Sequence, residues 1–156
     1  MKRKTSTPAL PTKFKGPEES PGFLLWKVSN AWQRRQRAAL QPLGITHSQF
    51  VVLAVATWFG VAETLTQARL STLSGVDPMT TSQIVRTLEA GGLLERDEHP
   101  GDIRAKSIAV TAEGGAKARE ALAVVEQVDT EFFARVSGCE RRLVNILKAL
   151  ARSEKS

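Results

Sequence analysis

The spacing of apolar residues predicts helices over most of the chain and one short pair of strands. Near the start, Leu25, Val28 and Trp32 recur every three to four residues, which is the period of a helix face. This pattern predicts a helix over residues 22–40. A proline at position 42 and a glycine soon after it end the helix.

The next segment begins with a capping box and is apolar on most sides. Thr46 can accept from the backbone of Gln49, and the Gln49 side chain can reach back to the Thr46 amide. The helix predicted from this cap to about Phe59 has apolar residues all round, which is typical of a buried helix. These residues are Phe50, Val51, Val52, Leu53, Val55 and Trp58.

Two shorter helices joined by a tight turn follow. Thr66 caps the first of them and Gly75 ends it. Asp77 and Pro78 open the second, with the acid at the cap and the proline at the first helical position. This second helix is predicted to run to about Ala90, where two consecutive glycines stop it.

A hairpin is predicted after these helices. Its strands are expected at residues 93–96 and 107–110, separated by a polar turn with Pro100 and Gly101. Two short helices followed by a two-stranded hairpin have the order of a winged helix-turn-helix. Residues 46–111 are therefore predicted to form such a lobe, with three helices and a hairpin wing.

Two longer amphipathic helices complete the pattern. The first is predicted over residues 111–136, and a second capping box, from Ser137 to Glu140, opens the last one. Their apolar stripes exceed what so small a lobe can cover. We therefore expect residues 22–40 and 112–152 to form a dimerisation region. The stripes are Leu122, Val125, Val128 (or Asp129), Phe132 and Val136 in one helix and Leu143, Ile146, Leu147 and Leu150 in the other.

Length and charge extend this picture. The 156 residues favour a single, mainly α domain at 21–152 after a tail at 1–20. The net charge is +6, and half of it lies in the tail, whose prolines, lysines, serines and threonines predict disorder. The basic excess suits an anionic partner such as nucleic acid. The tail is either a passive solvated segment or an arm that follows DNA.

Composition also predicts the compartment. No apolar run approaches the roughly 20 residues that span a bilayer, and no apolar segment of a secretory signal follows the N-terminal basic residues. The single cysteine, Cys139, excludes an internal disulfide. We expect a cytoplasmic protein without a membrane partner.

The helix after Asp77 has two distinct faces. At 100° per residue, Thr81, Ile84, Val85 and Leu88 fall on one side, and Met79, Ser82, Gln83 and Arg86 on the other. The second face carries no acid, and its arginine and glutamine can pair with guanine and adenine. This face is predicted to read bases in the major groove, and the alternative is an ordinary solvated face.

The tip of the hairpin carries a second candidate contact. Arg104 stands where a thin basic finger could enter a narrow minor groove, and Asp102 could hold its guanidinium by an ion pair. The alternative is a surface loop with incidental charges.

In these segments the chain resembles the MarR family of bacterial regulators over residues 22–152. The resemblance rests on the order and spacing of residues 44–50 (GITHSQF), 88–96 (LEAGGLLER), 102–106 (DIRAK) and 110–114 (VTAEG). It implies a winged-helix regulator whose outer helices interlock into a dimer.

The resemblance also implies roles for single residues. It assigns Asp102 and Arg104 to the wing signature, and it places Ser82, Gln83 and Arg86 where family members touch bases. Ile103 departs from the family, which often has a basic residue there, and this implies a weaker contact between wing and phosphate. The predicted DNA contacts are Thr80, Ser82, Gln83, Arg86, Asp102, Arg104 and Lys106.

A further implication concerns a ligand. Family members often bind small aromatic acids between the dimer helices and the DNA-binding lobe. By resemblance this region includes Trp26, Asn30, Phe50 and Trp58, which define the predicted effector pocket. Aromatic residues at helical spacing are also ordinary core, so both interpretations stand.

The sequence gives little support for a metal site or for catalysis. His47 and His99, in a cap and a loop, are expected to be solvated, and no metal-ligand spacing or cofactor motif occurs. Cys139 is expected to be an idle or buried thiol rather than a redox sensor. We therefore expect no metal, no cofactor and no enzymatic activity.

Together these features predict a sequence-specific transcriptional regulator. We expect a homodimer on double-stranded DNA at a pseudo-palindromic operator, acting as a repressor that a small aromatic carboxylate releases. The alternative is a winged-helix module for protein interaction or small-molecule binding that does not bind DNA.

Overall fold

The structure is a computed structural model that describes residues 10–99 and 101–153, without the side chains of residues 98, 99, 102–105 and 153. The described elements are mainly helices, with one two-stranded antiparallel hairpin. The predicted fold class is therefore confirmed. The chain divides into two compact units, Met1–Arg34 and Arg35–Ser156.

The first unit contains a short turn that the sequence did not predict. Residues Pro17–Glu19 form a 3-10 turn, η1, in which the Ser20 amide donates to the Pro17 carbonyl at 3.1 Å. Helix α1 (Pro21–Leu40) follows, and Lys27 pairs with Glu18 at 3.2 Å. Residues 1–9 of the predicted tail lie outside the described residues.

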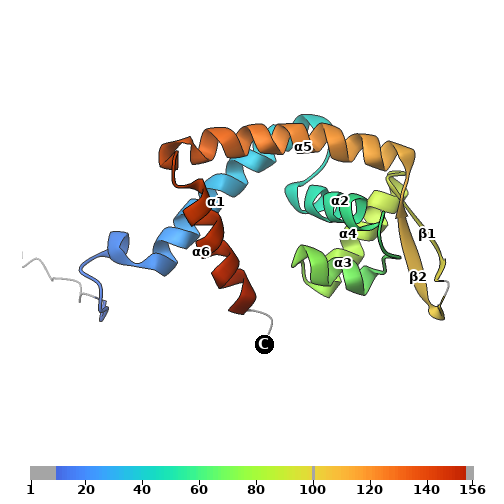
Figure 1. Cartoon of the computed structure of the whole chain (residues 1–156), viewed down its shortest axis with the longest axis horizontal. Coiled ribbons are helices and arrows are strands. Elements are labelled where there is room, and N and C mark those ends of the chain that lie inside the picture. Colours follow the sequence, from blue (N-terminus) through green and yellow to red (C-terminus); the bar gives the residue numbers. More distant parts are fainter. Residues whose placement is uncertain (1–9, 100, 154–156) are drawn as a thin grey trace, which may run out of the picture. The chain divides into compact units, whose positions relative to one another are not determined.

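In the second unit, three helices and the hairpin gather at the N-terminal end of α5 (Figure 1). The elements are η2 (Gln41–Leu43), α2 (His47–Phe59), α3 (Gln67–Ser74), α4 (Pro78–Ala90), β1 (Leu94–His99), β2 (Asp102–Val110) and α5 (Ala112–Phe133). Helix α2 contacts α3, α4, α5 and β2, so it is the centre of the lobe.

The predicted caps fix the helix ends. Thr46 forms both hydrogen bonds of its capping box with Gln49, at 3.2 and 2.9 Å. Thr66 and Asp77 cap α3 and α4 through their side chains. Gly75 ends α3 at a φ of 73°, a left-handed conformation that favours glycine and turns the chain toward α4.

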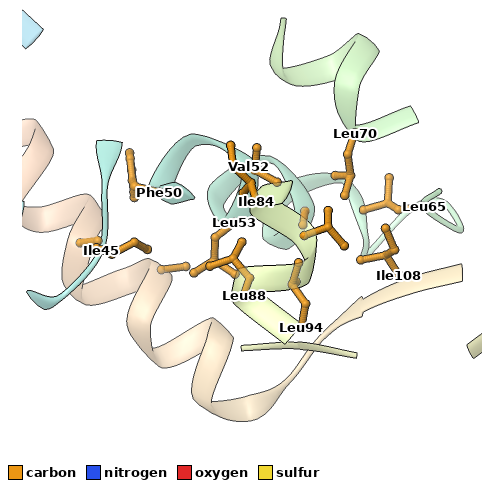
Figure 2. Packing of buried hydrophobic residues seen from close by; sticks show 14 of the residues in the cluster. Ile45, Phe50, Val52, Leu53, Leu65, Leu70, Ile84, Leu88, Leu94 and Ile108 are labelled. Atoms are coloured by element: carbon orange, nitrogen blue, oxygen red, sulfur yellow. The ribbon is translucent and has the colours of Figure 1, made fainter. Parts of the chain in front are cut away.

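The core lies between α2, α4 and the base of the hairpin. Figure 2 shows Leu53, Ile84 and Leu88 in one cluster with Leu94 and Ile108 of the strands. Each is at most 6% exposed. Since full burial of such a side chain contributes about 1.5–3 kcal/mol, this cluster holds the wing and the α4 helix to α2.

The hairpin is longer than the sequence predicted. The expected strands at 93–96 and 107–110 extend to His99 and back from Asp102, with a register shift after Glu98. The added residues are mostly charged or small, so their alternation carries no apolar signal. Leu65 adds an isolated bridge, because its carbonyl accepts from the Ile108 amide at 2.8 Å.

The end of the chain also departs from the expected boundaries. Helix α5 ends at Phe133, and Ala134–Val136 form a 3-10 turn, η3. The last helix, α6, spans Glu140–Ser153 and therefore begins after Cys139 rather than after Ser137. The Glu140 carboxylate accepts from the Gly138 amide at 3.0 Å, so the predicted capping box is wrong in position.

Candidate nucleic-acid interface

The turn between α3 and α4 is fixed by side chains. The Asp77 carboxylate accepts from the Thr80 amide at 2.9 Å, and its bonds with Thr80 lower the pKa of Asp77. The Val76 carbonyl accepts from the hydroxyls of Ser71, at 2.6 Å, and Thr81, at 3.2 Å. These bonds join both helices to one turn, so the start of α4 has a defined direction.

Helix α4 buries the face that the sequence predicted. Thr81, Ile84, Val85 and Leu88 are at most 6% exposed, whereas Gln83 and Arg86 on the other face are exposed. Met79 is 75% exposed at the start of that outer face. Thr80 and Ser82 are half-buried beside it.

One hydrogen bond organises the outer face. Arg86 donates from Nη2 to the Ser82 hydroxyl at 2.9 Å, one turn earlier along α4. The guanidinium keeps its remaining donors, and these are the groups that pair with a guanine edge. The face therefore offers an amide at Gln83 and an oriented guanidinium at Arg86.

The wing joins α4 by an ion pair that the sequence analysis missed. Arg96 of β1 donates to one carboxylate oxygen of Glu89 from Nε at 2.8 Å and from Nη2 at 2.7 Å. Glu89 lies in the last turn of α4, one residue before the helix ends at Ala90, and the segment between Glu89 and Arg96 contains the pair of glycines. The sequence offered only opposite charges seven residues apart, which is a weak signal.

The structure describes only some of the wing residues that are predicted to contact DNA. Asp102 begins β2 and Arg104 follows in the same strand, but their side chains lie outside the described part of the structure. Lys106 is exposed and pairs in register with Glu98. The ion pair expected between Asp102 and Arg104 stays a prediction.

The predicted effector residues occupy different environments. Phe50 is 5% exposed in the core, and Trp58 is 80% exposed. Trp58 lines a largely apolar cavity of about 500 Å³ between α2 and α5. The cavity is lined by Ala54, Thr57, Trp58, Val61, Ala118, Arg119, Leu122 and Glu126.

The other two predicted effector residues belong to the first unit. Trp26 is 64% exposed and stacks on Phe23 with ring centroids 6.3 Å apart. The Asn30 side chain donates to the Trp26 carbonyl at 2.7 Å. These contacts lie along α1 itself.

A polar cluster near the start of α2 was also missed. Gln36, which is fully buried, donates to the Asp129 carboxylate at 2.8 Å. His47 is half-buried, not solvated as predicted, and burial lowers its pKa while the charge of Asp129 opposes that shift. Such contacts between distant segments leave no local pattern in the sequence.

The remaining features concern the cysteine, the potential metal ligands and possible membrane helices of the described residues. Cys139 is exposed. Within the described ranges, no group of three or more potential metal-ligating His, Cys, Asp or Glu side chains occurs. In the same ranges no single helix is long and apolar enough to cross a membrane, and one bent pair, Pro21–Leu43 with His47–Phe59, meets that test only when joined.

The lobe and its wing define a winged-helix DNA-binding protein, and comparisons identify its family. The model of the MarR family matches residues 45–106. The HTH-type transcriptional regulator YdcH of Bacillus subtilis is 40% identical over 140 residues, which cover 89% of this chain and 95% of that protein. The HTH-type transcriptional repressor Rv2887 of Mycobacterium tuberculosis is 31% identical over 121 residues, covering 78% and 85%.

Solved structures agree. CouR from Rhodococcus jostii RHA1, bound to p-coumaroyl-CoA, matches with a TM-score of 0.76 and 29% identity over 90% of this chain and 94% of CouR. Rv2887 in complex with p-aminosalicylic acid matches with a TM-score of 0.66 and 29% identity over 85% and 98%. The chain therefore belongs to the MarR family of winged-helix transcriptional regulators.

Proposed function

We propose that the chain is a repressor whose helix α4 reads bases in the major groove of its operator. The observation that carries this proposal is the exposed face with Gln83 and Arg86, because residues 78–88 contain no acid. Thr80 and Ser82 add short hydroxyl donors beside them, and Lys106 adds a cation on the wing. Asp102 and Arg104 would meet the adjacent minor groove.

We propose further that two copies bind a pseudo-palindromic operator. In a two-fold dimer the recognition helices lie about 34 Å apart, so half-sites recur about every 10 base pairs. Selection from a random double-stranded DNA library tests this. We expect an inverted repeat with that spacing. Recovery of no preferred sequence would favour the alternative, a winged-helix interaction module that does not bind DNA.

The exposed apolar residues of α6 support a dimer. Val144, Ile146, Leu147 and Leu150 are between 45% and 54% exposed, although they lie on an amphipathic helix. In the first unit, the apolar start of α1 is exposed as well, with Leu25 at 55%. Surfaces of this kind mark interaction sites in stable proteins. We assign both to contact with a second copy, so residues 22–40 and 112–152 form the dimerisation region and 46–111 the DNA-binding lobe.

Sedimentation equilibrium tests the dimer. Leu147→Glu places a charge in the apolar stripe and should give a monomer with little affinity for DNA. Asn145→Glu adds the same charge on the opposite side of α6 and should remain dimeric. A DNA-binding monomer for Leu147→Glu, or for a chain without residues 139–156, would overturn this part of the proposal.

An aromatic carboxylate is the effector class that we propose. The α2–α5 cavity has the size of a ligand pocket, mostly apolar walls, and the Arg119 guanidinium to receive a carboxylate. Trp58 and Leu122 would cover the ring. Bound p-aminosalicylic acid in Rv2887 and p-coumaroyl-CoA in CouR support an aromatic ligand.

Titration with salicylate, followed by tryptophan fluorescence and DNA affinity, tests this assignment. Salicylate should weaken operator binding, and neutral salicylamide should act far less. Trp58→Phe should remove the fluorescence response. Trp26→Phe shows whether the pocket extends to Trp26 and Asn30 as the sequence predicted. No response to any aromatic carboxylate would leave the cavity as ordinary surface.

We propose no catalytic activity and residence in the cytoplasm. Membership of a family of transcriptional regulators supports both, because such proteins act by binding DNA. Turnover of the effector during the titration would contradict the first point.

A further inference from the structure

The Glu89–Arg96 ion pair connects the two elements that are proposed to contact DNA. Both guanidinium donors of Arg96 reach the same oxygen of Glu89, at 2.8 and 2.7 Å. The Arg96 side chain is only 26% exposed and that of Glu89 37%. The pair therefore holds the last turn of α4 against β1 in a partly covered position.

Arg96 lies where the hairpin leaves the lobe. It pairs in register with Ile108, which is 5% exposed and whose amide donates to Leu65. From this rung the hairpin continues through three more residues of β1 to His99, or about 10 Å at the rise of a strand. A rotation of about 10° at the rung would therefore move the tip by about 2 Å.

A displacement of that size matters for DNA contacts. Binding groups need placement within about 0.5 Å and 10–20° of their productive geometry. Backbone bonds and the packing of Leu94 and Ile108 hold the wing at its base, and neither attachment acts directly on the tip. An ion pair from the side adds a second point of attachment, and that attachment is to the recognition helix itself.

We propose that Glu89 and Arg96 are positioning residues that fix the wing relative to α4, so that groove contacts by both elements form together. This inference rests on the proposed function, because it assumes that the wing meets DNA. It assigns no DNA contact to either residue. It predicts instead that removing the pair lowers the contribution of the wing tip.

The chain provides a matched control in Glu63 and Arg69. Arg69 donates to Glu63 from Nε at 2.8 Å and from Nη2 at 3.0 Å, so the pair has the same chemistry. It joins the start of α3 to the preceding loop and has no part in the wing. Glu63→Gln therefore reproduces the chemical change of Glu89→Gln at a pair that does not join α4 to the hairpin.

A double-mutant cycle with Arg104→Ala measures the coupling. The readout is affinity for an operator with A·T flanks relative to one with G·C flanks. Glu89→Gln alone should lose most of the A·T preference that Arg104→Ala loses. The double variant should lose less of this preference than the product of the two single-variant losses, by a factor of about three or more. Glu63→Gln should combine with Arg104→Ala without coupling.

Amide hydrogen exchange gives a readout that does not involve DNA. Glu89→Gln should speed exchange in the hairpin beyond the Arg96 rung by about fivefold, with the α2 core unchanged. Multiplicative losses in the cycle, or unchanged hairpin exchange, would overturn the positioning role. If Arg104→Ala changes nothing while hairpin exchange rises in Glu89→Gln, the proposed wing contact is wrong and the ion pair is a structural attachment only.

Discussion

The Arg86 guanidinium donates to the Ser82 hydroxyl at 2.9 Å, across one turn of the exposed face of α4. Residues four apart on a helix are neighbours, so this bond forms without distortion. It restricts a long side chain that otherwise loses rotamer freedom when it binds. The bond therefore favours one orientation of Arg86 in the free protein.

Loss of this bond should weaken one base contact. Ser82→Ala should reduce operator affinity by about 0.5–1.5 kcal/mol, mainly at the base pair that Arg86 reads. Thr87→Ala is the control, because the Thr87 hydroxyl donates to the Gln83 carbonyl and not to Arg86. Fluorescence anisotropy with operator duplexes measures both. Equal losses for the two variants would argue against an orienting role for Ser82.

Two adjacent glycines of α5 should respond in opposite ways to alanine. A Cβ on Gly114 would overlap the Leu93 carbonyl and lie 3.0 Å from Val110 Cγ1, so Gly114→Ala should destabilise the lobe by about 1–3 kcal/mol. A Cβ on Gly115 meets only the mobile end of Arg119, at 3.5 Å. Gly115→Ala should stabilise by about 0.5–1 kcal/mol. Urea unfolding measures the stability of both variants. Similar changes in stability at the two positions would contradict the close packing of α5 on the wing.

His47 should make stability depend on pH. Burial lowers its pKa in the folded state, so between that pKa and the ordinary value near 6.5 the unfolded chain binds more protons. Stability should therefore rise with pH through this window and fall as the pH drops below about 6.5. His47→Gln should flatten the change in Tm between pH 7 and pH 5. His99→Gln, at the other histidine of the chain, should leave this change in Tm unaltered. A flatter change in His99→Gln than in His47→Gln would refute the assignment of the pH dependence to His47.

The sequence predicted the inner and outer faces of α4 because a surface helix carries its burial pattern in its own period. The three caps at Thr46, Thr66 and Asp77 were predictable for the same local reason. Glu89–Arg96 and the Leu65 bridge depend on segments that meet only after folding, so no spacing rule finds them. The buried side of His47 was missed because its covering residues come from distant parts of the chain.

The cavity at Trp58 shows a related limit. The sequence marked Trp58 as a pocket residue by resemblance, and the structure does place it in a cavity wall. It places Phe50 in the core instead, because α2 is covered on the side of Phe50. An aromatic residue on a helix that is apolar all round cannot be assigned to core or pocket without its neighbours.

Base recognition by Gln83 and Arg86 can be measured with alanine variants of the two residues. Affinities of Gln83→Ala and Arg86→Ala are compared with the parent on operators mutated base by base at fixed salt. Each variant should lose about 1–3 kcal/mol of discrimination at one position in each half-site and little elsewhere. Losses that are equal on every sequence would mean that both residues only touch phosphate. No loss from either variant would contradict the account, because α4 would then not face DNA.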